Sequence, residues 1–165
     1  MLSIGERGVY PQANSNKKDT SNSDKSKYKR ISVGDIGYNT MRMWQGRSAL
    51  SGLEGIVSPA YTIVTPLENT NSVFFSYLFK LDEMVHKFYR NSQGMVSDTL
   101  MCKFKDFKIV KFMTPPTKEE QTAIAKVLLN SDKEIELLNK KRDQLKDQKK
   151  GLMQQLLTGK KRLKF

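Results

Sequence analysis

The C-terminal part of the chain carries one long apolar repeat, which limits the possible folds more than any other feature. Residues 117–158 contain no proline and are rich in Lys, Glu, Gln, Leu and Ala, which favour a helix. Heptad spacing from Leu128 continues through Ser131, Ile135, Leu138, Arg142, Leu145, Lys149, Leu152 and Leu156. Six of these nine positions are apolar, as in a coiled-coil seam with polar interruptions. The repeat predicts a helix on the order of 60 Å long.

Both ends of this segment carry signals for a helix boundary. Thr117 and Glu120 have the spacing of a capping box, directly after Pro115-Pro116. Gly159 suits the left-handed conformation that closes many helices. The pair Ser131-Asp132 leaves open a second interpretation, in which a short helix precedes a long one.

A helix of this length needs a partner to cover its apolar stripe. The preceding residues, about 115 in number, would span only about 25–30 Å when compact. We therefore expect the stripe to pack against a helix from a second copy or from another subunit, through Leu128, Ile135, Leu138, Leu145, Leu152 and Leu156. Binding to a membrane surface fits less well, because the polar face mixes acidic with basic residues and the stripe lacks Trp and Phe.

The composition indicates a folded domain at residues 1–114, before the helical region at residues 115–165. Of the 165 residues, 38% are hydrophobic, with 8 Phe, 6 Tyr and 8 Met, which is enough for a core. No segment approaches the roughly 18 apolar residues of a membrane span, and the N-terminus has no apolar signal-peptide core. The single cysteine, Cys102, cannot form an internal disulfide. We expect a cytoplasmic protein.

Short β signals dominate the first part of the predicted domain. Residues 1–30 are polar and poorly periodic, whereas residues 28–33 and 56–64 are predicted strands. Pro59 within the second of these indicates an edge strand or a bulge. Residues 104–113 are predicted to form one or two further strands.

One helix is expected between these strands. Asn71 or Ser72 would cap it, and residues 91–98 would form the turn after it. Its apolar stripe consists of Phe74, Leu78, Leu81, Val85 and Phe88. The predicted fold class is therefore α+β: a small globular domain of mixed or antiparallel strands with helices, followed by a long C-terminal coiled-coil-type helix.

The charge of the chain points to a polyanionic partner. Lys and Arg number 29 against 17 Asp and Glu, a net charge of +12. Lys and Arg side chains that neutralise phosphates release condensed counterions, although anionic membranes attract basic chains too. The polar loop and first strand supply the candidate phosphate contacts, which are Lys17, Lys18, Lys25, Lys27, Lys29 and Arg30.

A second segment, residues 37–48, has the chemistry to read bases in DNA. Arg pairs bidentately with guanine and Asn or Gln with adenine, while Tyr and Trp pack against sugar or base. The candidate base contacts are Tyr38, Asn39, Arg42, Trp44, Gln45 and Arg47. A loop of the same kind at residues 90–94 adds Arg90 and Gln93.

Catalytic patterns are missing from the sequence. The only histidine, His86, lacks the second histidine of a zinc-protease motif, and no glycine-rich phosphate loop is present. Thr114–Thr117 has neither the Asn nor the aromatic residue of an amino-methyltransferase signature. We expect no catalytic residues and no metal site in this chain.

Several motifs together resemble one known family. They are GDI at 34–36, YNTMRMWQG at 38–46, EGIVSPAY at 54–61, DF at 106–107, PP at 115–116, EQTAIA at 120–125 and KGLMQQLLTG at 150–159. In combination these motifs resemble the specificity subunits of type I restriction–modification systems, with a target-recognition domain and a spacer helix. The resemblance covers roughly residues 28–160.

The resemblance implies a sequence-specific, non-catalytic DNA-binding subunit. One recognition domain reads half of a split site in double-stranded DNA, and the long helix pairs antiparallel with a second such helix. That helix also docks the methyltransferase subunits, while a restriction subunit carries the motor. S-adenosylmethionine, ATP and Mg belong to those partner subunits, and this chain binds no cofactor itself.

The chain departs from the family in having one recognition domain and one helix, where specificity subunits usually have two of each. The sequence therefore suggests a half-length subunit or a truncated one, which forms a homodimer or pairs with another half. An alternative is an assembly module without DNA affinity, or a remnant that only pairs through its helix. A stand-alone enzyme is a third interpretation, against which the missing catalytic residues argue.

Overall fold

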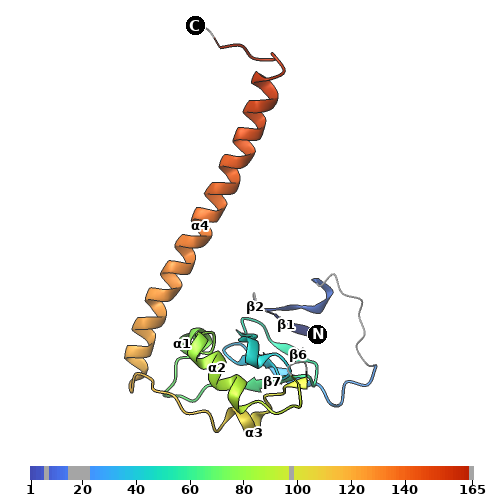
Figure 1. Cartoon of the computed structure of the whole chain (residues 1–165), viewed down its shortest axis with the longest axis vertical. Helices are drawn as coiled ribbons and strands as arrows, with labels where there is room; N and C mark the ends of the chain where they lie inside the picture. Colours follow the sequence, from blue (N-terminus) through green and yellow to red (C-terminus); the bar gives the residue numbers. More distant parts are fainter. Residues whose placement is uncertain (6–7, 15–22, 97–98, 164–165) are drawn as a thin grey trace. The chain divides into compact units, whose positions relative to one another are not determined.

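The computed structural model describes residues 1–5, 8–14, 23–96 and 99–163, and Figure 1 shows its ribbon. The chain divides into two compact units, one covering Met1–Ala125 and a second that begins at Lys126. Within the described residues, the first unit holds two small sheets and three short α-helices, and the long helix α4 (Lys118–Leu156) begins in it. These elements confirm the α+β fold with a long C-terminal helix.

One sheet joins strands that are distant in the sequence. Its described strands lie in the order β2, β1, β6 and β3, with bounds Gly8–Pro11, Leu2–Gly5, Gly55–Val57 and Lys29–Ile31. β1 and β6 run parallel, and the other neighbours are antiparallel. β3 confirms the strand predicted at residues 28–33. The hairpin of β1 and β2 was not predicted, because residues 1–30 are mostly polar.

The second sheet leads to the segment predicted to read bases. It consists of β5 (Ser48–Leu50), β4 (Ile36–Asn39) and β7 (Tyr61–Val64), in that order and antiparallel throughout. The prediction of one strand over residues 56–64 is wrong, because Pro59 has no N–H for the ladder and lies in a turn. Tyr61 N donates to Ser58 O across this turn at 3.0 Å. β6 and β7 therefore enter different sheets.

A close approach of the two sheets depends on Gly37. A Cβ at this position would collide with Ile4 Cδ1, so a larger residue here would force the Ile4 side chain to move. Ile31 lies on the same side, and its side chain is fully buried. The N-terminal hairpin is thus part of the core of the globular unit.

The helix predicted from residue 74 to 88 is in fact two helices (Figure 1). They are α1 (Ser72–Leu78) and α2 (Asp82–Asn91). Asn71 caps α1 as predicted, since its Oδ1 accepts a hydrogen bond from the first turn at 2.9 Å. The prediction of one continuous helix is wrong, because the backbone of Leu81 is extended. The two acidic residues that follow Leu81 favour a new helix N-terminus. Leu81 is 55% exposed, and Phe79 is buried instead.

Residues 104–113 do not form the predicted strands. They begin with the short helix α3 (Phe104–Phe107) and continue without regular structure. Asp106 is buried, and its Oδ2 accepts a hydrogen bond from Lys103 N at 3.1 Å, which fixes this turn. The ring of Phe107 lies 5.4 to 5.5 Å from those of Tyr38, Phe79 and Phe88. The strand prediction failed because these aromatic contacts come from distant parts of the chain.

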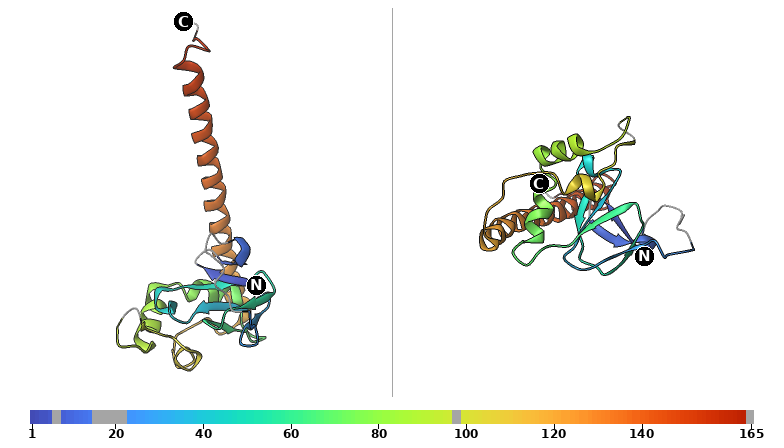
Figure 2. Two further views of the ribbon diagram at one scale, coloured as in Figure 1. Left: turned by 90° about the vertical axis from the view of Figure 1, so that its right-hand side faces the viewer. Right: turned by 90° about the horizontal axis from the view of Figure 1, so that it is seen from below.

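The helix α4 is unbroken over its 39 residues, and Figure 2 shows it from two further directions. It spans about 58 Å at ~1.5 Å per residue. The division considered at Ser131-Asp132 does not occur. Thr117 Oγ1 accepts a hydrogen bond from Glu120 N at 3.3 Å, and Gly159 has φ at 72°, so both predicted caps are present.

The first two turns of α4 are tied to the globular unit. Gln121 is buried there, where its Oε1 accepts from Asn71 N at 2.9 Å and its Nε2 donates to Pro115 O at 3.0 Å. Ala125 is the last buried residue, and none of residues 126–163 is buried. The first compact unit extends to Ala125, so the start of α4 belongs to it.

Candidate nucleic-acid interface

The loop after β4 carries most of the residues predicted to contact bases. Asn39 Oδ1 accepts a hydrogen bond from Met41 N at 2.9 Å, which turns the chain out of the strand. A short 3-10 helix, η2 (Met43–Gln45), follows, and the buried Met43 anchors it. Gly46 then closes the loop with φ at 70°. This geometry leaves Gln45 and Arg47 exposed and Arg42 and Trp44 half-buried.

The helix α2 packs directly against this loop. Trp44 meets Tyr89 edge-on, with ring centroids 6.1 Å apart, and its Nε1 donates to Met41 O at 2.9 Å. A Cβ at Gly46 would lie 3.0 Å from Val85 of α2, so the loop and the helix are in close contact. Arg90, next to Tyr89, is exposed at the end of α2. The structure therefore brings Arg90 close to the first predicted loop.

Backbone hydrogen bonds link the second predicted loop, residues 90–94, to the loop after β4. Gln93 and Met101 exchange two hydrogen bonds, at 3.0 and 2.9 Å. Cys102 N, next along the chain, donates to Thr40 O at 2.8 Å. The side chain of Gln93 is exposed, and its Oε1 accepts from Lys105 Nζ at 3.5 Å. Two loops that the sequence predicted separately are thus linked through the backbone of Met101 and Cys102.

The predicted phosphate contacts before and within β3 differ in their surroundings. Lys29 Nζ donates to Tyr61 O at 2.6 Å and to Pro59 O at 3.4 Å. Lys25 Nζ lies 4.6 Å from the centre of the Tyr28 ring, a cation–π contact. Lys27 is exposed. The remaining two predicted contacts, Lys17 and Lys18, lie outside the described residues.

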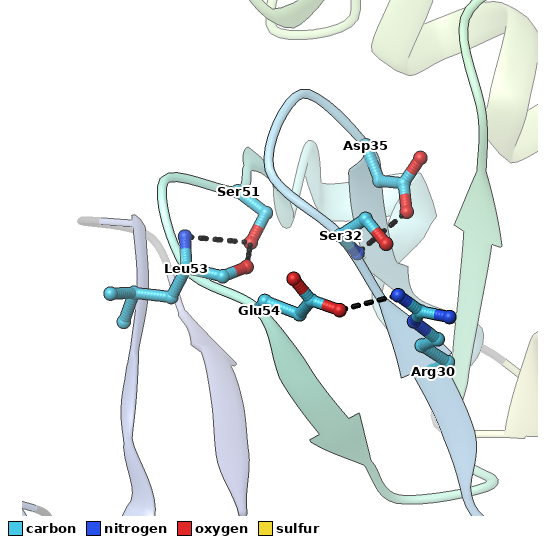
Figure 3. A network of polar contacts seen from close by, with 6 residues as sticks. All are labelled: Arg30, Ser32, Asp35, Ser51, Leu53 and Glu54. Carbon is cyan, nitrogen blue, oxygen red and sulfur yellow. Dashed lines mark hydrogen bonds and ion pairs between the residues drawn. The ribbon is translucent and has the colours of Figure 1, made fainter.

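Arg30 takes part in an ion pair across the sheet. Figure 3 shows its guanidinium beside Glu54, with Nη2 and Oε1 2.5 Å apart. In the same network Asp35 Oδ2 accepts from Ser32 N at 2.8 Å, at the turn after β3 (Figure 3). An exposed pair of this kind contributes only about 0–1 kcal/mol. A phosphate can therefore compete with Glu54 for Arg30.

Tyr38 is a core residue, which corrects the prediction that its side chain contacts DNA. It is fully buried and stacks on Phe107. Burial raises the pKa of its hydroxyl well above the ordinary value for tyrosine. The residue faces inward because β4 lies between two strands and has its inner face covered by α3.

We expect Tyr38→Phe to leave DNA affinity unchanged, because the lost hydroxyl is inside the core. The free energy of unfolding should stay the same or rise by up to about 1 kcal/mol, since this hydroxyl has no hydrogen-bond partner among the described residues. Urea denaturation and DNA binding, measured on the same samples, check both statements. Weaker DNA binding at unchanged stability would contradict the core assignment.

Two lysines near this surface were not among the predicted contacts. Lys103 and Lys105 are exposed on either side of Phe104. Lys105 falls within the strands predicted at residues 104–113, and neither lysine was predicted to contact DNA. Their alternation with Phe104 and Phe107 is the same mixture of basic and aromatic residues that marked the first loop.

Residues with catalytic or metal-binding chemistry do not gather in the part of the chain that the structure describes. No group of three or more His, Cys, Asp or Glu side chains is close enough there to hold a metal ion. His86 is exposed, with its ring 6.4 Å from that of Tyr89. Cys102 is buried, and burial raises the pKa of its thiol to about 11. The described helices include none that is long and apolar enough to cross a membrane.

The predicted pairing residues of α4 are all exposed. They are Leu128, Ile135, Leu138, Leu145, Leu152 and Leu156. Exposure along this stripe ranges from 37% at Leu128 to 59% at Leu138. Apolar residues in a continuous row on a monomer commonly mark an interaction site. The stripe is therefore a second candidate interface.

Together these observations define a basic α+β domain followed by the long helix α4. Residues 5–147 match the family described as "Type I restriction modification DNA specificity domain", and the chain belongs to this family. The resemblance seen in the sequence motifs is thereby confirmed.

Two curated relatives come from Methanocaldococcus jannaschii. The chain is 33% identical over 135 residues to the putative type I restriction enzyme MjaX specificity subunit. The aligned region covers 82% of this chain and 28% of that protein. It is 31% identical over 143 residues to the type I restriction enzyme MjaVIII specificity subunit, and the aligned region covers 81% of this chain and 32% of that protein. The chain thus spans about a third of the length of these relatives.

Proposed function

We propose that the globular unit binds double-stranded DNA and reads one half of a split target sequence. The observation that carries this proposal is the link between the two loops through the backbone hydrogen bonds from Gln93 to Met101 and from Cys102 to Thr40. These linked loops carry Arg42, Gln45, Arg47, Arg90 and Gln93. Arg and Gln are side chains that discriminate bases through paired hydrogen bonds in the major groove. Membership of a DNA specificity family supports the same function.

Selection from a library of randomised duplexes tests this proposal. We expect the full chain to enrich a short sequence motif over random DNA. If two copies of the chain pair, each selected duplex should contain two copies of this motif. Binding to all duplexes alike would contradict sequence reading. No binding to any duplex, together with an intact paired helix, would favour the alternative of an assembly module.

We propose further that α4 pairs with a second α4, from another copy of this chain or from another specificity subunit. The support is the exposed stripe, which no described residue covers beyond Ala125. Pairing two copies would place two recognition units under two-fold symmetry, one for each half of the site.

The charges in the stripe favour antiparallel pairing. A parallel pair would place Arg142 against Arg142 and Lys149 against Lys149 within the seam, and like charges repel. An antiparallel pair centred on Lys140 instead sets Arg142 beside Leu138 and Lys149 beside Ser131. The same register matches four of the five remaining apolar positions with each other, Leu128 with Leu152 and Ile135 with Leu145, and sets Leu156 beside Ile124.

In this proposal the chain is the recognition part of a larger complex in the cytoplasm. The paired helices would dock the methyltransferase subunits, and a restriction subunit would join them. S-adenosylmethionine, ATP and Mg would serve those subunits, while this chain selects the sequence. Binding of a purified methyltransferase subunit to the chain, measured with and without residues 126–165, tests the docking role of α4.

A further inference from the structure

A hollow of about 410 Å³ opens where three basic segments of the globular unit meet. The residues that line it include the exposed Lys29 and Lys103, the buried Thr40 and Thr62, and the apolar side chains of Met41 and Phe104. The volume lies within the range of small-ligand sites. Met41 is the residue directly before Arg42, so the hollow adjoins the loop proposed to read bases.

The lysine on one side of the hollow is held in position. Lys29 Nζ donates hydrogen bonds to Tyr61 O at 2.6 Å and Pro59 O at 3.4 Å. An ammonium group has three donors, so one remains for a ligand in the hollow. The two carbonyl contacts restrict the flexible side chain before any ligand binds, which lowers the entropic cost of binding.

The lining of the hollow combines polar and apolar groups. Thr40 Oγ1 and Thr62 Oγ1 lie 3.0 Å apart, and both residues are buried. Two hydroxyls that share one hydrogen bond keep a second O–H that can donate to a ligand. Around them, Met41 and Phe104 offer apolar surface. The site thus has two cations and a hydroxyl donor for an anion, beside apolar area for a ring.

We propose that this hollow seats one sugar–phosphate unit of the DNA backbone, an inference that rests on the DNA-binding function proposed above. Lys29 and Lys103 neutralise the phosphate, and the deoxyribose packs against Met41 and Phe104. Charge complementarity selects this occupant, because the described residues that line the hollow include two lysines and no acidic side chain. Backbone contacts set the register of a protein on its duplex. A phosphate held here fixes where Arg42 and Arg47 meet the bases.

The test measures how the affinity of the full chain for a duplex depends on salt. Each phosphate contact contributes about 0.9 to the slope of log K against log salt. We expect Lys29→Gln and Lys103→Gln each to reduce the slope by about 0.9, so that a fourfold rise in salt weakens binding about 3.5-fold less than in the unaltered chain. Lys103→Arg keeps the charge and should keep the slope.

A matched control is Lys80→Gln, which removes the same charge from an exposed lysine between α1 and α2. Lys80 does not line the hollow, so we expect the salt slope of the Lys80→Gln variant to match that of the unaltered chain. An equal fall for Lys80→Gln and Lys103→Gln would show an effect of net charge and overturn the backbone site.

The outcomes also separate this inference from the proposed function. Unchanged slopes for Lys29→Gln and Lys103→Gln, beside salt-dependent binding by the unaltered chain, overturn the hollow as a phosphate site and leave DNA binding intact. Absence of any duplex binding by the unaltered chain overturns both.

Discussion

A chain with Leu145→Glu is expected to behave as a monomer of 18.9 kDa in light scattering, whereas the unaltered chain is expected to form a dimer. Leu145 lies in the middle of the exposed stripe and faces Ile135 of the other copy in the proposed register. Losing one buried leucine costs each copy about 1.5–3 kcal/mol, so the dimer loses about 3–6 kcal/mol. The dissociation constant should rise by about 10² to 10⁴. Burying the unpaired carboxylate adds a further cost.

Leu137→Glu is the matched control for this change. Leu137 is 65% exposed and lies off the heptad positions of the stripe, so the same substitution there should leave the dimer intact. Glu and Leu have similar helix propensities, and circular dichroism should show equal helix content in all three chains. Equal dissociation by both variants would mean that another face of α4 pairs. A monomeric unaltered chain would mean that the second helix comes from a different subunit.

Cysteine cross-linking separates the two orientations of the pair. A disulfide needs Cα atoms about 4.4 to 6.8 Å apart. In the proposed antiparallel register, a chain with both Ile135→Cys and Leu145→Cys forms a cross-linked dimer, and neither single variant does. In a parallel pair the same residue of both copies would face each other, so each single variant would form a cross-linked dimer. The natural Cys102 is buried in the globular unit and provides no competing thiol on the helix.

The sequence predicted α4 well because its signals are local and repeated. The heptad positions from Leu128 to Leu156 and the absence of proline all favour the same element. The shorter elements were harder, as residues 74–88 show. Leu81 and Phe79 both fit an apolar stripe, and packing of Phe79 against Phe88 decides which of them is buried.

The candidate site was only partly predictable for the same reason. Residue type alone made Arg42, Gln45 and Arg47 candidates, since their chemistry suits bases wherever the loop lies. Tyr38 had suitable chemistry too, but the alternation of β4 directs its side chain into the core. The position of Lys103 depends on the hydrogen bond from Cys102 to Thr40, a contact between distant segments that no local pattern reveals.

Arg47→Ala is expected to reduce discrimination between the preferred duplex and other sequences by about 1–3 kcal/mol, or about 5- to 150-fold. The side chain of Arg47 is exposed, while its backbone is fixed within the loop. Arg47 N donates to Arg42 O at 3.3 Å, and Arg47 O accepts from Asn39 N at 3.2 Å. Because the side chain takes no part in these bonds, its removal should preserve the loop. Affinities for the selected duplex and for random duplexes measure the change.

Arg47→Lys distinguishes base reading from a simple attraction to phosphate. Lysine keeps the positive charge but lacks the planar fork that pairs with two acceptors on guanine. If Arg47 reads a base, Arg47→Lys should lose most of the discrimination that Arg47→Ala loses, while the salt slope stays near that of the unaltered chain. If Arg47 holds a phosphate, Arg47→Lys should keep the discrimination, and Arg47→Ala should weaken all duplexes equally. The same two substitutions, to Ala and to Lys, can be made at Arg42. Because the Arg42 side chain is half-buried, Arg42→Ala should also lower the stability of the fold.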